Sequence, residues 1–159
     1  MKVLFVCSGN ICRSPMAAEY FRQRAPGAGL SHVVVGSAGL LGIDDAPASL
    51  ESVRAMREIG IDLDAHRSTG LTARELRSSD LVVVMTDDHV DEITARFEGS
   101  IAELHKLRAF EKGSQPSTVA PDLDDPIGRS ESFYQKQIPI LSRCVDHLFL
   151  YLKYDDRRI

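Results

Sequence analysis

The sequence predicts an α/β fold in which a four-stranded parallel sheet carries helices on both faces. Short runs rich in β-branched residues alternate with longer segments that have the spacing of amphipathic helices. Residues 81–85 are apolar throughout, as is typical of strands buried on both sides. Strands that alternate with helices imply a parallel sheet covered on each side. At 159 residues, the chain has the length of one such domain.

The first predicted strand and helix flank a short polar loop. Residues 3–6 predict the strand, and residues 15–24 predict the helix, with Ser14 as its N-cap. A second strand is expected over residues 33–35, ended by the small residues 36–39.

Helical patterns follow the second strand. A second helix is expected to start near Pro47, with Asp45 or Ala46 as its cap, and to end at Gly60. Residues 72–77 predict a short third helix.

The last part of the chain predicts two further strands and two helices. Thr86 follows the strand at 81–85 and is a good N-cap for a helix. Residues 104–107 predict the fourth strand. From Ser132 onward, apolar residues recur every three or four positions, which predicts a long helix with one buried stripe. Pro139 is expected to kink this helix or to shift its start.

Composition narrows the class of protein. One domain is expected over residues 1–154, with a frayed tail at 155–159. The net charge of −4 argues against general affinity for nucleic acid or anionic membranes. No apolar segment approaches the roughly 20 residues of a membrane span, and the N-terminal apolar run is too short for a signal peptide. Three cysteines without zinc-site spacing predict reduced thiols in a cytoplasmic protein without a bound metal.

The segment between the first strand and the first helix has the geometry of an oxyanion site. Cys7 closes the strand, Arg13 opens the helix, and five residues lie between them. The N–H groups of a tight loop and the positive end of a helix point into one concavity, and Gly9 lets the backbone approach the anion. Positive potential there favours the thiolate of Cys7, a nucleophile for phosphorus, while Arg13 adds a two-pronged contact. The N–H groups expected to hold the phosphate belong to Ser8, Gly9, Asn10, Ile11, Cys12 and Arg13.

Two other interpretations of this segment are weaker. An inert buried cysteine does not account for the loop, the helix start and Arg13 together. A nucleotide-binding P-loop is excluded, because no second glycine follows Gly9 at the required spacing and no Lys-Ser or Lys-Thr comes after it.

The sequence Val-Cys-Ser-Gly-Asn-Ile-Cys-Arg-Ser-Pro at residues 6–15 resembles that of the low-molecular-weight protein tyrosine phosphatases. The resemblance extends over essentially the whole chain. It includes Ser-Ala-Gly at 37–39, His-Arg-Ser-Thr-Gly-Leu-Thr at 66–72 and Asp-Pro at 125–126. It implies a parallel sheet with strand order 2-1-3-4 and a phosphate-binding loop after the first strand.

The resemblance also implies hydrolysis of protein phosphotyrosine in two steps, without a cofactor. Cys7 would form a phosphocysteine intermediate, and Arg13 would clamp the phosphate. Asp125 would protonate the leaving group and then activate water. Asp124 is a rival on sequence alone, but Pro126 stiffens Asp125 and matches the family motif.

Further roles follow from the same resemblance. Cys12 is implied to form a reversible disulfide with Cys7, which protects the nucleophile from over-oxidation. We also expect Asn10 to adopt a left-handed backbone, and the Ser14 hydroxyl to donate to the Cys7 sulfur. The side chains implied to hold the loop by hydrogen bonds are Asn10, Ser14, Ser37 and His66.

The expected substrate pocket departs from the family pattern. Leu41 and Ile127 stand where the family usually carries aromatic residues that grip a phosphotyrosine ring. Both are apolar, so an apolar pocket is still expected. It would lack the aromatic stacking on the substrate ring, which contributes about 0.5–1.5 kcal/mol per contact. Ile11 is the third wall; a related bacterial subgroup that acts on phosphoarginine carries threonine there, so Ile11 favours phosphotyrosine.

The expected partners are a phosphorylated protein and, in the loop, phosphate or another oxyanion, while the oligomeric state is left open. Two alternatives also stay open: a phosphoarginine or small-molecule phosphatase of the same fold, and a non-catalytic phosphate-binding or redox-sensing module.

Overall fold

Four parallel strands form the centre of the protein in the order β2-β1-β3-β4, which confirms the predicted sheet. The computed structural model describes residues 1–99 and 101–154, so the predicted tail at 155–159 lies outside the described residues. The strands are β1 (Lys2–Cys7), β2 (Val34–Gly39), β3 (Leu81–Val84) and β4 (Leu104–Lys106). In the sheet, Cys7 lies opposite Gly39, and Val6 lies opposite Val84.

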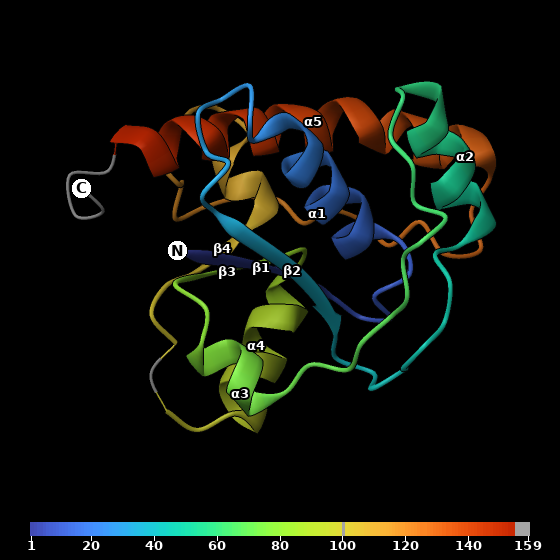
Figure 1. Ribbon diagram of the computed structural model, residues 1–159. Coiled ribbons are helices and arrows are strands. Elements are labelled where there is room, and N and C mark those ends of the chain that lie inside the picture. Colours follow the sequence, from blue (N-terminus) through green and yellow to red (C-terminus); the bar gives the residue numbers. More distant parts are fainter. Residues whose placement is uncertain (100, 155–159) are drawn as a thin grey trace.

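Helices cover both faces of the sheet, as Figure 1 shows. One layer consists of α1 (Arg13–Arg24), α2 (Leu50–Glu58) and α5 (Glu131–Tyr154), with the short 3₁₀ helix η1 (Leu107–Phe110) against α5. The other layer consists of α3 (Ala73–Arg77) and α4 (Asp87–Arg96).

Side chains of β1 alternate between two apolar cores, because successive residues of a strand face opposite sides of a sheet. Val3 and Phe5 belong to the larger core, which also holds the buried faces of α1 and α5. Leu4 and Val6 belong to the smaller core, which includes Ile93 of α4. Within residues 1–99 and 101–154, no helix is long and apolar enough to cross a membrane.

The start of α1 differs from the prediction. The helix begins at Arg13, with Cys12 at the N-cap position, so Ser14 lies in the first turn and is not the cap. Ser14 is fully buried, and its hydroxyl bonds to Cys7 and Asn10 instead of to the helix backbone. Pro15 still lies in the first turn, where its missing N–H costs no intrahelical hydrogen bond.

The second strand also differs from the prediction, because β2 runs through residues 36–39 and does not end before them. Its partner β1 supplies backbone hydrogen bonds along the whole segment. Tertiary pairing here overrides the low strand propensity of glycine and serine. As a result, Ser37 is a strand residue that faces the loop after β1.

The second helix begins later than predicted, at Leu50, and Ser49 caps it by accepting a hydrogen bond from Ser52 N–H. The predicted caps, Asp45 and Ala46, lie in a loop whose backbone N–H groups donate to Ser68. The local sequence favours a helix start near Pro47. The pairing of Pro47 with Arg67 instead keeps this segment outside the helix.

The remaining helices follow the predictions closely. Thr86 caps α4, and Thr72 forms a capping box with Glu75 at the start of α3. The long helix α5 begins at Glu131 and continues through Pro139, so the proline does not shift its start.

Candidate active site

A cavity of about 210 Å³ lies at the carboxyl end of β1, where ligands bind in open parallel sheets. It combines a thiol, a guanidinium and a carboxylate with apolar side chains. The residues that line it are Cys7, Ser8, Gly9, Ile11, Cys12, Arg13, Leu41, Ile43, Asp125 and Ile127.

Asn10 holds the loop between β1 and α1 in shape. Its φ of 56° is left-handed, as predicted, and asparagine tolerates this conformation. Its side-chain amide donates to Ser14 Oγ at 2.8 Å and to Ser37 Oγ at 2.9 Å, while Oδ1 accepts from Thr69 N–H at 2.9 Å. His66 Nε2 donates to the Asn10 carbonyl at 2.7 Å. The structure thus brings together all four predicted supporting residues around the loop.

Cys7 is buried and lines the cavity, and two donors face its sulfur. Ser14 Oγ lies 3.0 Å from Sγ, and the Asn10 backbone N–H donates to Sγ at 3.3 Å. Because Ser14 Oγ already accepts from the Asn10 amide, its own hydrogen is left for the sulfur or for the Ala38 carbonyl, which lies 3.5 Å away, and the sulfur is the nearer acceptor. Both hydrogen bonds stabilise a thiolate more than a thiol.

Gly39 permits the loop to sit directly on β2. A Cβ at this position would lie 2.9 Å from backbone atoms of Ser8, Gly9 and Asn10. The Ser-Ala-Gly segment therefore contributes the Ser37 hydroxyl and the space that the phosphate loop occupies.

Arg13 is buried, and its guanidinium reaches the segment that carries the two candidate acids. Nη1 donates to the Leu123 carbonyl at 2.8 Å, and Nη2 lies 3.3 Å from Asp125 Oδ2. Among the described residues, the buried Nε–H has no hydrogen-bond partner. A buried guanidinium that keeps an unsatisfied N–H beside a cavity is a candidate donor for an oxyanion.

Asp125 and Asp124 are separated by the structure. The Asp125 side chain is 45% exposed, lines the cavity and accepts a hydrogen bond from Ile127 N–H at 3.1 Å. The Asp124 side chain does not line the cavity, and its backbone carbonyl accepts from Gln137 Nε2 at 2.5 Å.

Cys12 lies beside the loop with its sulfur among hydroxyl groups. Its Sγ bonds to Ser49 Oγ at 3.3 Å and to Tyr134 Oη at 3.5 Å. Cys7, Cys12 and Cys144 are all free thiols. Burial, followed by the contact with Cys12, raises the pKa of Tyr134, so its hydroxyl remains protonated.

The cavity walls are apolar, as expected, and the sequence reasoning missed one of them. Ile11, Leu41 and Ile127 line the cavity together with Ile43. Ile43 stands two residues after Leu41 on the same exposed loop, and this proximity in sequence is the signal that could have identified it as a wall residue.

His89 is the second residue that the sequence reasoning missed. It is buried in the first turn of α4, and its Nε2 lies 2.9 Å from Ser8 Oγ. Burial, followed by the charge of Arg13, lowers the pKa of His89 to about 4, so its ring is neutral at physiological pH. No sequence pattern singled out this histidine among the residues that follow Met85.

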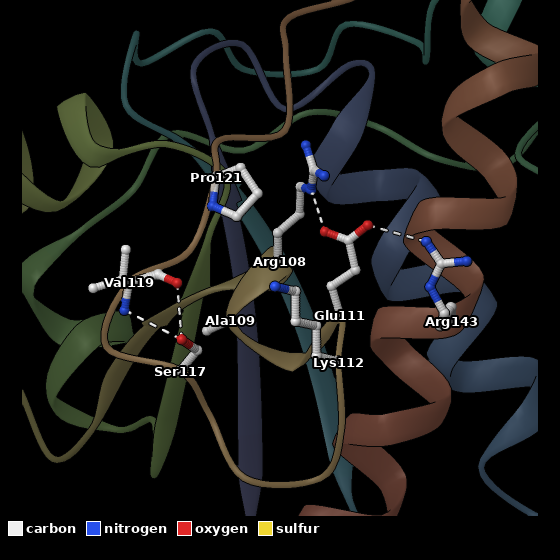
Figure 2. A pocket seen from close by; sticks show the side chains of 8 residues that line it. All are labelled: Arg108, Ala109, Glu111, Lys112, Ser117, Val119, Pro121 and Arg143. Atoms are coloured by element: carbon white, nitrogen blue, oxygen red, sulfur yellow. Dashed lines mark hydrogen bonds and ion pairs between the residues drawn. The ribbon is translucent and has the colours of Figure 1, made fainter.

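A second, larger cavity of about 380 Å³ is lined by η1 and the loop at residues 111–121, with Arg143 of α5 at one side (Figure 2). Glu111 stands between Arg108 and Arg143 there and pairs with both at 2.7 Å and 3.0 Å. Arg108 also donates to the Asp122 carbonyl at 3.0 Å, so this cluster supports the segment that leads to Asp125. Within residues 1–99 and 101–154, no group of three or more metal-binding side chains is assembled.

The sequence profile of the low molecular weight phosphotyrosine protein phosphatases matches residues 2–158. The chain belongs to this family. Its members are cysteine-dependent phosphatases.

The similar proteins include some that are named tyrosine phosphatases and others that are named arginine phosphatases. A probable low molecular weight protein-tyrosine-phosphatase of Ralstonia solanacearum is 34% identical over 91% of this chain and 90% of its own length. A protein-arginine-phosphatase of Bacillus subtilis is 35% identical over 99% of this chain and 100% of its own. A structure of the arginine phosphatase YwlE, in which a mutant's active-site serine is phosphorylated, superposes with a TM-score of 0.90 at 33% identity and covers 100% of both chains.

Proposed function

We propose that this member of the family is a cytoplasmic enzyme that hydrolyses phosphotyrosine in proteins through a phosphocysteine intermediate, without a metal or other cofactor. The observation that carries the proposal is that Cys7, Arg13 and Asp125 line one cavity, although Asp125 is distant from the other two in sequence. A nucleophile, a cation and an acid at the same site are the groups that a phosphomonoesterase needs.

In the first step, the Cys7 thiolate attacks phosphorus and the bond from phosphorus to the tyrosyl oxygen breaks. Asp125 gives its proton to that oxygen, so that tyrosine leaves as a neutral phenol. The loop N–H groups and the guanidinium of Arg13 bind the non-bridging oxygens, whose charge redistributes in the transition state.

In the second step, water attacks the phosphocysteine. The Asp125 carboxylate accepts a proton from the water, the S–P bond breaks, and Cys7 leaves as a thiolate that the Ser14 hydroxyl stabilises. Inorganic phosphate is released, and Asp125 is again protonated for the next cycle.

The cavity walls support an aromatic substrate. Ile11, Leu41, Ile43 and Ile127 offer apolar surface to a phenyl ring, whereas a phosphorylated guanidinium would lose hydration against these four side chains. The similarity to arginine phosphatases, and the absence of aromatic side chains at positions 41 and 127, favour phosphoarginine as the second candidate substrate.

The chemistry is tested by hydrolysis of para-nitrophenyl phosphate by wild type, Cys7→Ser and Cys144→Ala. We expect Cys7→Ser to abolish turnover and Cys144→Ala to retain it, because burial raises the pKa of Cys144 to about 12 and keeps it a thiol inside the core. Equal rates for wild type and Cys7→Ser would refute the mechanism.

Substrate preference is tested by comparing kcat/KM for peptides of one sequence that carry phosphotyrosine, phosphoarginine or phosphoserine. We expect phosphotyrosine to be preferred. An Ile11→Thr variant removes apolar wall surface, so its ratio of phosphoarginine to phosphotyrosine activity should rise. A wild-type preference for phosphoarginine would establish the second candidate.

A further inference from the structure

A buried imidazole from α4 contacts a hydroxyl group in the phosphate loop. Ser8 Oγ lies 2.9 Å from His89 Nε2 and 3.5 Å from Arg13 Nη2. Ser8 lines the active-site cavity, whereas His89 is only 4% exposed and does not line it. His89 can therefore affect a bound phosphate only through Ser8 or through the shape of the loop.

The hydrogen bonds around His89 define the orientation of its ring and the position of its proton. The Met85 backbone N–H donates to His89 Nδ1 at 3.3 Å, so this nitrogen carries a lone pair. The neutral ring then has its hydrogen on Nε2, directed at Ser8 Oγ. Thr86 Oγ1 accepts from the His89 backbone N–H at 3.2 Å and fixes the first helical turn that carries the ring.

A serine hydroxyl has two acceptor sites and one hydrogen. In Ser8, His89 Nε2–H and Arg13 Nη2–H occupy the acceptor sites, so the hydrogen is directed away from both donors. Non-bridging phosphate oxygens in the cavity are acceptors for this hydrogen.

We propose that His89 is a positioning residue that turns the Ser8 hydroxyl hydrogen toward the bound phosphate. Ser8 then donates to the phosphate through its side chain as well as through its backbone N–H. This inference rests on the proposed function, because it assigns an additional donor to the same phosphate site.

The test is a double-mutant cycle read out as the inhibition constant of inorganic phosphate. Ser8→Ala removes the donor, and we expect phosphate to bind about tenfold more weakly. His89→Asn leaves an oxygen that can accept from Met85 N–H but is too short to reach Ser8, and should weaken binding about threefold. In the double variant we expect no loss beyond that of Ser8→Ala, because His89 acts through the hydroxyl. Ser8→Thr keeps the hydroxyl and should therefore recover phosphate binding relative to Ser8→Ala.

The matched control is His147→Asn. His147 is a half-buried histidine of α5 whose Nδ1 donates to the Phe110 carbonyl, and it does not line the active-site cavity. Its variant should leave phosphate inhibition unchanged. Additive losses in the double variant would indicate a purely structural role for His89 and overturn the proposal.

Ser8→Ala keeps the proposal testable if His89→Asn fails to fold: unchanged phosphate inhibition in Ser8→Ala alone would also overturn it. If wild type neither hydrolyses para-nitrophenyl phosphate nor binds phosphate, the proposed function itself fails. If wild type does both but the cycle is additive, only the role of His89 fails.

Discussion

At the scale of single residues, the neighbouring aspartates differ in what they face. Asp125 lines the active-site cavity beside Arg13, and Asp124 does not line it. A general acid matters most when the leaving group is a poor one. We therefore expect Asp125→Ala to lower kcat for a phosphotyrosine peptide about 10²–10⁴-fold, and to lower it much less for para-nitrophenyl phosphate. Asp124→Ala is the matched control, and a larger effect from it would reassign the acid.

Cys12 gives a second prediction at this scale. Mild peroxide should oxidise the Cys7 thiolate to a sulfenic acid, which the Cys12 thiol then attacks to form a disulfide and water. A thiol reductant should restore activity to wild type but not to Cys12→Ser, in which Cys7 oxidises further. Mass spectrometry of the peroxide-treated proteins distinguishes the two products, and only sulfonate at Cys7 in wild type would contradict a protective role.

At the scale of elements, the contact between β2 and the phosphate loop is too close for a side chain. Gly39→Ala places a Cβ 2.9 Å from loop backbone atoms, so the loop must shift away from Cys7. We expect a loss of kcat/KM of at least tenfold, because displaced N–H groups no longer match the phosphate oxygens. Gly36→Ala is the control in the same strand, since its Cβ meets the flexible end of Leu4 at 3.3 Å. Equal activities of the two variants would contradict the argument.

At the scale of the whole molecule, four titratable groups predict that stability falls as pH falls. Hydrogen bonds from Arg108 lower the pKa of Glu111. Burial by itself would raise the pKa of Asp122, but hydrogen bonds from the Lys106 side chain and the Asp87 backbone outweigh it, so the pKa of Asp122 is lowered. Both carboxylates therefore contribute stability that is present above their unfolded pKa values, near 4, and lost as pH falls through the lower folded values.

The buried histidines act in the same direction at higher pH. Burial lowers the pKa of His66 and, with the charge of Arg13, that of His89 to about 4. Below about pH 6.5, these histidines bind protons in the unfolded chain but not in the folded protein, so the free energy of unfolding decreases as the pH falls. For His89 the decrease amounts to about 3 kcal/mol at pH 4. Urea denaturation between pH 4 and 8 should show this slope, and His89→Asn should flatten it while His147→Asn does not. A free energy of unfolding that stays constant from pH 7 to 5 would contradict the prediction.

The sequence by itself determined the sheet, the helical layers and the phosphate loop. Cys7, the loop and Arg13 are consecutive in the chain, so their geometry depends on one strand end and one helix start, which are local features. The same locality explains why Thr86 was predicted correctly as the cap of α4.

Only the tertiary structure decided the features that depend on distant segments. It places Asp125 rather than Asp124 at the cavity, brings His89 to Ser8, adds Ile43 to the walls, and extends β2 through glycines. Each depends on contacts between segments far apart in sequence, which no periodicity or local propensity encodes. The chemistry of the loop can therefore be predicted from the sequence. By contrast, folding is what brings Asp125, the Ser8 hydroxyl held by His89 and the substrate walls together at the cavity.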